Sequence, residues 1–82
     1  MLNNIAIIAG SGKLPFIVAK FLRKNKINFI VISLKKITTV SFSKKYKNYS
    51  LSLGNGKKAI KILKENSIKN ILFLGALNRP TL

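Results

Sequence analysis

The sequence predicts a small α/β, Rossmann-like fold: a parallel sheet of three to four strands in the order 3-2-1-4, with helices on its faces. Two observations carry this prediction. Short apolar runs rich in β-branched residues alternate with longer segments whose apolar residues recur at helical spacing. A glycine-containing turn joins the end of a strand to the start of a helix at residues 10–12 and again at residues 54–56. A chain of 82 residues has room for one domain, residues 1–82.

The first three elements form a strand–helix–strand unit. Residues 4–9 are a short apolar run typical of a strand buried on both faces. Residues 13–24 carry apolar side chains at helical spacing, and Pro15 lies in the first turn, where its missing N–H costs no hydrogen bond. Residues 28–33 form a second buried strand. Such a unit, within about thirty residues, is parallel and right-handed in nearly all cases.

The second half of the chain repeats the pattern less clearly. Residues 34–48 are a connection with room for a short helical turn, and residues 49–53 alternate like a short third strand. A second helix follows the glycines at 54–56, and residues 70–74 form the last strand. In the order 3-2-1-4 this last strand lies beside the first. A doubly wound sheet normally continues from such a strand, so we expect the N-terminal domain of a larger protein.

The composition excludes most independent catalysis. The chain has 16 Lys and Arg residues, Glu65 as its single acid and a net charge of +15, with no His, Cys or Asp. We therefore expect no catalytic residue and no metal ligand set in this chain, because thiol, imidazole and paired carboxylates are all missing. The longest apolar run, residues 5–9, is too short to span a bilayer, which favours a cytoplasmic protein. The excess positive charge favours anionic partners: nucleic acid, phosphorylated ligands or a membrane face.

The first candidate binding site is the turn after the first strand. It consists of six consecutive residues: Gly10, Ser11, Gly12, Lys13, Leu14 and Pro15. The glycines permit close approach of a ligand, and the helix N-terminus offers free N–H groups to a phosphate. The equally weighted alternative is that any strand-to-helix turn favours glycine. A nicotinamide or flavin role is disfavoured, since Lys35 and Lys36 stand where the ribose-binding acid is expected, and no complete P-loop motif is present.

Two further candidates follow later strands. The segment from Gly75 to Pro80 would adjoin the first turn at the same edge of the sheet, and Arg79 there has the geometry to clamp a phosphate or carboxylate. The alternative is a surface arginine before a turn proline. A third possible anion site lies at the start of the second helix and consists of Gly54, Gly56, Lys57 and Lys58; a simple helix cap is the plainer explanation.

Taken together, these motifs resemble those of a known family. Three segments carry the resemblance: Ile7-Ile-Ala-Gly-Ser-Gly-Lys-Leu-Pro15, Leu53-Gly54 and Gly75-x-x-x-Arg79-Pro80-x-Leu82. In this order and spacing they are similar to the N-terminal domain of the LpxI family, the UDP-2,3-diacylglucosamine pyrophosphatases of lipid A biosynthesis. The resemblance implies a two-domain enzyme that hydrolyses UDP-2,3-diacylglucosamine to UMP and 2,3-diacylglucosamine 1-phosphate. Its C-terminal domain, absent from this chain, carries the catalytic acid and binds Mg²⁺ or a similar divalent metal.

For this chain, the resemblance implies substrate-binding or interdomain roles at the matching loop residues, and no cofactor of its own. The expected partners are the UDP-linked diacylated sugar, the missing C-terminal domain and, peripherally, the inner face of the inner membrane. The chain departs from the family pattern at Lys57, where the family has glycine, and at Lys35 and Lys36, where it has acids.

We expect no pyrophosphatase activity from the chain alone. Two alternatives stay open. One is a small basic module that binds nucleic acid through phosphate contacts, although no helix-turn-helix or aromatic RNA-binding signature is present. The other is a decayed or split gene product without a function of its own.

Overall fold

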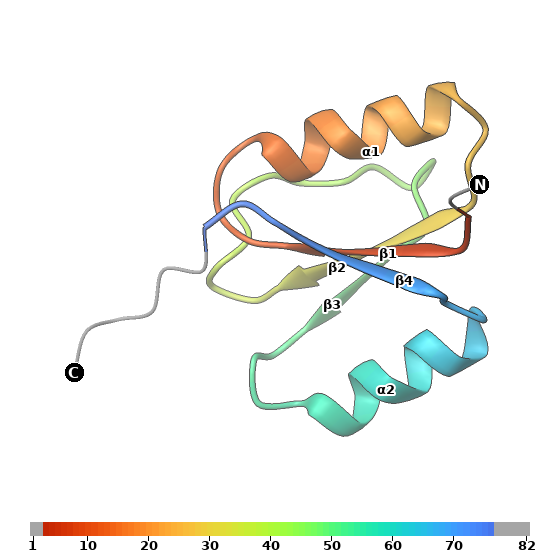
Figure 1. Cartoon of the computed structure of the whole chain (residues 1–82). Helices are drawn as coiled ribbons and strands as arrows, with labels where there is room; N and C mark the ends of the chain where they lie inside the picture. Colours follow the sequence, from red (N-terminus) through yellow and green to blue (C-terminus); the bar gives the residue numbers. More distant parts are fainter. Residues whose placement is uncertain (1–2, 77–82) are drawn as a thin grey trace.

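Six elements make up the chain in the computed structural model, which describes residues 3–76 (Figure 1). In chain order they are β1 (Ile5–Ala9), α1 (Leu14–Lys24), β2 (Phe29–Leu34), β3 (Asn48–Leu51), α2 (Gly56–Glu65) and β4 (Asn70–Leu74). Every strand and helix expected from the sequence is present. The third strand begins one residue earlier and ends two residues earlier than expected.

The four strands form one parallel sheet in the order β3-β2-β1-β4, which confirms the predicted topology. β1 is central and pairs along its whole length with β2 on one side and β4 on the other. Helix α1 covers one face of the sheet and α2 covers the other (Figure 1). Because all strands run the same way, their carboxyl ends lie at one edge, where the predicted binding turns are found.

The core lies on both faces of the sheet because β1 contributes side chains to each. Ile5, Ile7 and Ala9 pack against α1, whereas Ala6 packs on the α2 side. The buried partners are Ala19, Leu22, Val31 and Tyr46 on the α1 side and Ile30, Ile32, Leu51 and Ile62 on the α2 side. This double burial explains why the sequence of β1 is a continuous apolar run and not an alternating one.

Both helices end in the same way. The side-chain amides of Asn25 and Asn66 donate to the carbonyls four residues earlier, at 2.8 Å in each helix. The next residues, Lys26 (φ 57°) and Ser67 (φ 52°), adopt the left-handed conformation usually taken by glycine. The amide of the residue after each donates back into the last helical turn, so this arrangement satisfies carbonyls that a helix end leaves free.

The long connection between β2 and β3 packs through aromatic side chains. It contains hydrogen-bonded turns and no helix, so the short helical turn allowed for in the sequence does not form. Tyr46 is buried, and its ring contacts those of Phe16, Phe29 and Phe42. Over residues 3–76, neither helix is long and apolar enough to cross a membrane.

Candidate functional site

The loops that follow β1 and β4 are joined at the carboxyl edge of the sheet. Ser11 and Ala76 form an antiparallel bridge: the Ser11 N–H donates to the Ala76 carbonyl at 2.7 Å, and the Ala76 N–H donates to the Ser11 carbonyl at 3.1 Å. The Gly10 N–H donates to the Leu74 carbonyl at 2.7 Å, and the Ser11 hydroxyl to the Ala76 carbonyl at 3.1 Å. The first predicted site therefore adjoins Gly75, where the second predicted site begins, as the strand order requires.

Two glycines make this close contact possible. A Cβ atom at Gly10 would lie 2.5 Å from the Ala76 carbonyl oxygen, far inside van der Waals contact. Gly75 has a φ of 87°, and a Cβ there would collide with the Ser11 carbonyl oxygen. Glycine is needed at both positions because two backbones meet there, so the glycines first of all lock the two loops together.

A pair of threonines, which the sequence did not single out, connects β2 to the same edge. The Thr38 hydroxyl donates to the Ala9 carbonyl at 2.6 Å and accepts the Leu34 N–H at 2.7 Å. The Thr39 hydroxyl accepts the Gly12 N–H at 2.8 Å, where Gly12 has a φ of 96°. The segments after β1, β2 and β4 thus form one hydrogen-bonded platform.

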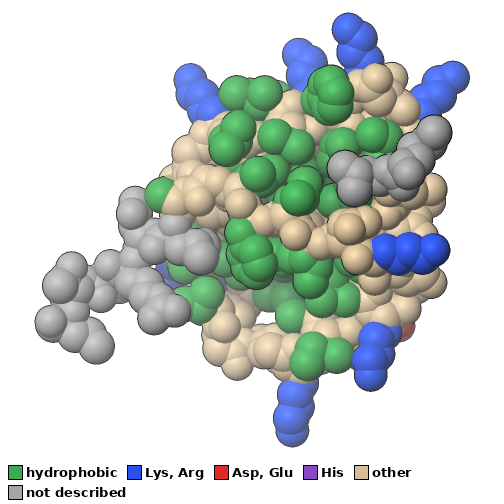
Figure 2. All heavy atoms as spheres, viewed as in Figure 1, with side chains coloured by type: hydrophobic (Ala, Val, Ile, Leu, Met, Phe, Trp, Pro, Cys, Tyr) green, Lys and Arg blue, Asp and Glu red, His purple; other side chains and the backbone are tan. Residues whose placement is uncertain are grey.

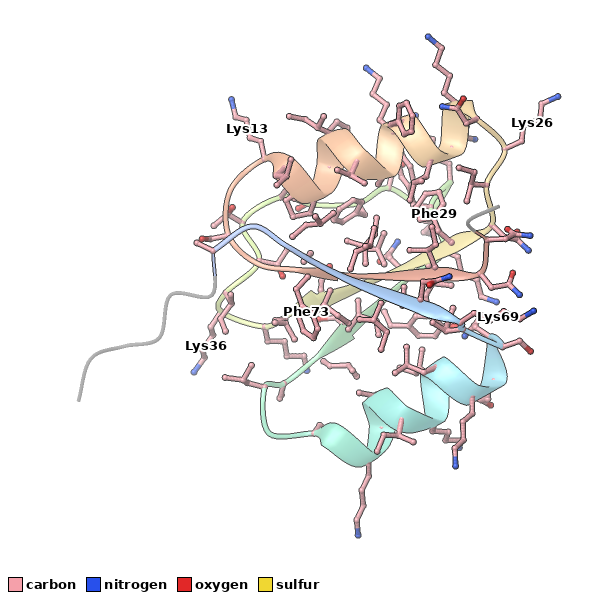
Figure 3. The ribbon with its side chains drawn as sticks, in the orientation of Figure 1. Lys13, Lys26, Phe29, Lys36, Lys69 and Phe73 are labelled. Atoms are coloured by element: carbon pink, nitrogen blue, oxygen red, sulfur yellow. The ribbon has the colours of Figure 1, made fainter. Side chains whose placement is uncertain are left out.

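Two lysines, Lys13 and Lys36, lie at this end of the sheet (Figure 3). Lys13 is the exposed N-cap residue of α1, and the first turn of that helix contains no acid to neutralise its partial positive charge. Lys36 follows β2. Leu14 is exposed beside Lys13, whereas the Pro15 side chain is fully buried and anchors the start of the helix. The edge therefore combines two exposed ammonium groups with a helix N-terminus, which suits an anionic group.

The remaining predicted residues lie apart from this platform or outside the described part. Gly54 belongs to the turn before α2, two strands away from β1, and neither its φ nor its surroundings require glycine. Lys58 lines a separate surface cavity of about 560 Å³ on α2 with Tyr49 and Lys61. Arg79 and Pro80 lie outside the described residues.

The residues of this chain do not fit a divalent metal. Within residues 3–76, no three His, Cys, Asp or Glu side chains come together, and Glu65 is the only acid of the whole sequence. Hard cations such as Mg²⁺ take carboxylate and carbonyl oxygens as ligands, usually with more than one carboxylate nearby. The described residues therefore offer no ligand set for such a cation.

The fold and the joined glycine loops define a small Rossmann-like domain of the class that holds ligands at the carboxyl edge of a parallel sheet. The model of the LpxI N-terminal domain family matches residues 4–82, and the chain belongs to this family. The resemblance noted in the sequence is confirmed, and membership associates the chain with lipid A biosynthesis. None of the curated proteins matches the chain significantly.

Proposed function

We propose that this chain is the N-terminal, substrate-binding domain of a UDP-2,3-diacylglucosamine pyrophosphatase of the LpxI family. The observation that carries the proposal is the platform at the carboxyl edge, formed by residues that belong to the family's loop motifs. Gly10, Ser11 and Gly75 build it, and Lys13 borders it. Its place at the end of β1 and β4 is where open α/β sheets bind nucleotides and sugars.

The geometry suits the diphosphate of the UDP-linked sugar. Leu14 and Phe16 are first-turn residues of α1, whose N–H groups lie outside the helical hydrogen-bond ladder and face the end of the helix. The ammonium groups of Lys13 and Lys36 add charge of the right sign at the same end of the sheet (Figure 3). The Gly12 N–H already donates to the Thr39 hydroxyl, so it is not available to a phosphate in this arrangement. Gly12 instead leaves room for a ligand, because nothing lies within 4 Å of where its Cβ would be.

The chemistry itself belongs to a second domain in this proposal. That domain would supply the catalytic acid and hold the Mg²⁺ or similar metal, and this chain would hold and orient the substrate. Such an enzyme acts on a lipid substrate at the cytoplasmic face of the inner membrane. A basic surface on the binding domain favours both the anionic substrate and the anionic leaflet.

Binding of UDP-2,3-diacylglucosamine in neutral detergent micelles, measured with the 82-residue chain and its variants, tests the proposal. Lys13→Gln removes a charge beside the platform, and Lys26→Gln removes one at the opposite end of α1 (Figure 3). We expect Lys13→Gln to weaken binding about fivefold, which corresponds to the ~1 kcal/mol of an exposed charge contact, and Lys26→Gln to leave it unchanged. Equal loss in both variants, or no binding of the wild type, contradicts the proposal.

A second candidate function is supported by a basic cavity of about 350 Å³ at the other end of the molecule. Arg23, Lys26, Lys45 and Lys47 line it. The Arg23 guanidinium and the Lys45 ammonium lie 5.8 and 5.6 Å from the Tyr46 ring centre. A nucleic-acid-binding module would use such a cluster for phosphate contacts. Binding to random duplex DNA that falls steeply with salt, without preference for uridine nucleotides, would support this function over the first.

A further inference from the structure

The two adjacent threonines after β2 are held in very different ways. The Thr38 hydroxyl is fixed on both sides, by the Ala9 carbonyl at 2.6 Å and the Leu34 N–H at 2.7 Å, and the Thr38 N–H donates to the Leu34 carbonyl at 2.9 Å. The Thr39 side chain is exposed, and among the described residues its hydroxyl makes one hydrogen bond, as acceptor of the Gly12 N–H at 2.8 Å. Thr38 therefore fixes the position of the loop, whereas Thr39 adds a single contact that can open without moving it.

The Gly12 N–H belongs to a loop that is short of hydrogen-bond donors. Gly12 lies two residues before the first residue of α1. The N–H groups of Leu14 and Phe16, in the first turn of that helix, lie outside the helical hydrogen-bond ladder, but Pro15 between them has no N–H to offer. An anion at this helix end meets one donor fewer than usual, so the Gly12 N–H gains importance as a contact.

Charge favours an anion over a hydroxyl at this N–H. Hydrogen bonds with an ionised partner are roughly twice as strong as those between neutral groups. Lys13 and Lys36 lie at the same end of the sheet, and Lys36 belongs to the turn that leads to Thr39 (Figure 3). The N-terminus of α1 adds partial positive charge. The Thr39 hydroxyl is a neutral acceptor and gains little from these charges, whereas a phosphate oxygen gains from both.

No acidic side chain of the described residues competes for this place. On the face that Figure 2 shows, basic side chains project around the margin and acidic atoms are visible at one small spot. Glu65, the single acid of the sequence, lines a cavity with Asn4 and Asn28, which directly precede β1 and β2 at the opposite edge of the sheet. The Gly12 N–H therefore has no carboxylate beside it, and the neutral Thr39 hydroxyl accepts it instead.

We propose that Thr39 is an intramolecular competitor of the ligand. Its hydroxyl accepts the Gly12 N–H in the free chain, and an oxygen of the substrate diphosphate accepts that N–H in the complex. Thr39 then turns about its Cα–Cβ bond into another staggered rotamer, which an exposed side chain can adopt, while Thr38 keeps the backbone in place. This inference rests on the part of the proposed function that places a diphosphate at the carboxyl edge.

Thr39 acts through Gly12 and is therefore a positioning residue. In the empty site it holds the Gly12 N–H, and Gly12 keeps its left-handed φ of 96°. In the complex its hydroxyl has been displaced, so its presence lowers the affinity for the ligand. A residue that only fastened the two loops would have the opposite effect, because its loss would deform the site and weaken binding. The direction of the change in affinity thus separates the two roles.

Two variants at this position test the proposal. Thr39→Val removes the hydroxyl but keeps the branched side chain, and Thr39→Ser keeps the hydroxyl and is the matched control. UDP-2,3-diacylglucosamine in neutral micelles should bind Thr39→Val about threefold more tightly than the wild type. That factor corresponds to ~0.6 kcal/mol, a value in the range of one exposed hydrogen bond. Thr39→Ser should bind like the wild type.

The Gly12 amide reports the change of partner directly. In ¹⁵N–¹H spectra of the free chain, Thr39→Val should move the Gly12 proton signal upfield and speed its hydrogen exchange, because the hydrogen bond is lost. Inorganic pyrophosphate is the second probe, since it carries the diphosphate without uridine or lipid. It should move the Gly12 signal of Thr39→Val downfield again, and in the wild type it should change the Thr39 rotamer, measured by side-chain couplings. Uridine, which has no phosphate, should leave the wild-type Gly12 signal in place.

The outcomes separate this inference from the proposed function. If the UDP-linked sugar binds the wild type, but Thr39→Val binds it equally or more weakly, the inference is wrong and the proposed function stands. A Thr39 rotamer that stays unchanged in the complex would have the same meaning. If only pyrophosphate binds, and binds Thr39→Val more tightly, the proposed substrate is wrong and the competitor role of Thr39 is upheld. If neither probe shifts an amide of residues 10–14, both are wrong.

Discussion

The contact between the two glycine loops can be broken by one methyl group. In Gly10→Ala the new Cβ would lie 2.5 Å from the Ala76 carbonyl oxygen, so the loops must separate by about 0.9 Å to reach the 3.4 Å of ordinary contact. The two backbone hydrogen bonds between Ser11 and Ala76 cannot survive that separation at good geometry. At ~1 kcal/mol each, their loss, together with the strain, should lower the free energy of unfolding by about 2–3 kcal/mol.

Urea denaturation followed by circular dichroism measures this change. For a chain of this size the slope is about 1–2 kcal/mol per M, so the unfolding midpoint of Gly10→Ala should fall by about 1–2 M. Gly54→Ala is the matched control, because a Cβ at Gly54 has nothing within 4 Å and its φ is ordinary. That variant should be neutral or stabilising by up to about 1 kcal/mol. If Gly10→Ala unfolds within about 0.5 kcal/mol of the wild type, the loops are not joined as described.

Three further predictions concern the same chain. Thr38→Val removes the hydroxyl that pairs with the Ala9 carbonyl and the Leu34 N–H, and it should lower the free energy of unfolding by about 1–3 kcal/mol. Thr39→Val, at an exposed position, should lower it by under about 0.5 kcal/mol. Similar losses in the two variants would refute the bridging role of Thr38. Ser67→Gly relieves a left-handed φ of 52° and should raise the thermal midpoint, with a gain of about 1 kcal/mol; a lower midpoint would contradict that cap geometry. The purified chain with Mg²⁺ should release no UMP from UDP-2,3-diacylglucosamine, and detectable release would show that the chemistry does not need a second domain.

The sequence was sufficient for the fold because its local signals agree with one another. The continuous apolar runs of β1 and β2 mark strands buried on both faces, and Pro15 marks the start of α1. Strand–helix–strand order then fixes parallel pairing and handedness. The predicted order places β4 beside β1, and the adjacency of the Gly10 and Gly75 loops follows from that order.

The site was only partly predictable, because its remaining parts depend on contacts distant in sequence. Nothing in the pair Thr38-Thr39 signals that one hydroxyl bridges β1 to β2 and the other accepts the Gly12 N–H 27 residues away. The left-handed Lys26 and Ser67 were likewise hidden, since such positions normally carry glycine. Helical periodicity marked Leu14, Ile17 and Phe21 as one apolar stripe, but only the packed structure shows that all three stay exposed.

The most direct test of substrate binding at the carboxyl edge is a two-dimensional ¹⁵N–¹H NMR titration of the labelled chain with UDP-2,3-diacylglucosamine in neutral micelles. We predict that the largest saturable shifts fall on the amides of residues 10–14, 36–39 and 75–76, where the loops after β1, β2 and β4 meet. UMP should reproduce part of the same pattern. Shifts confined to residues 23–28 and 45–47, around the basic cavity at the other end, would contradict the account.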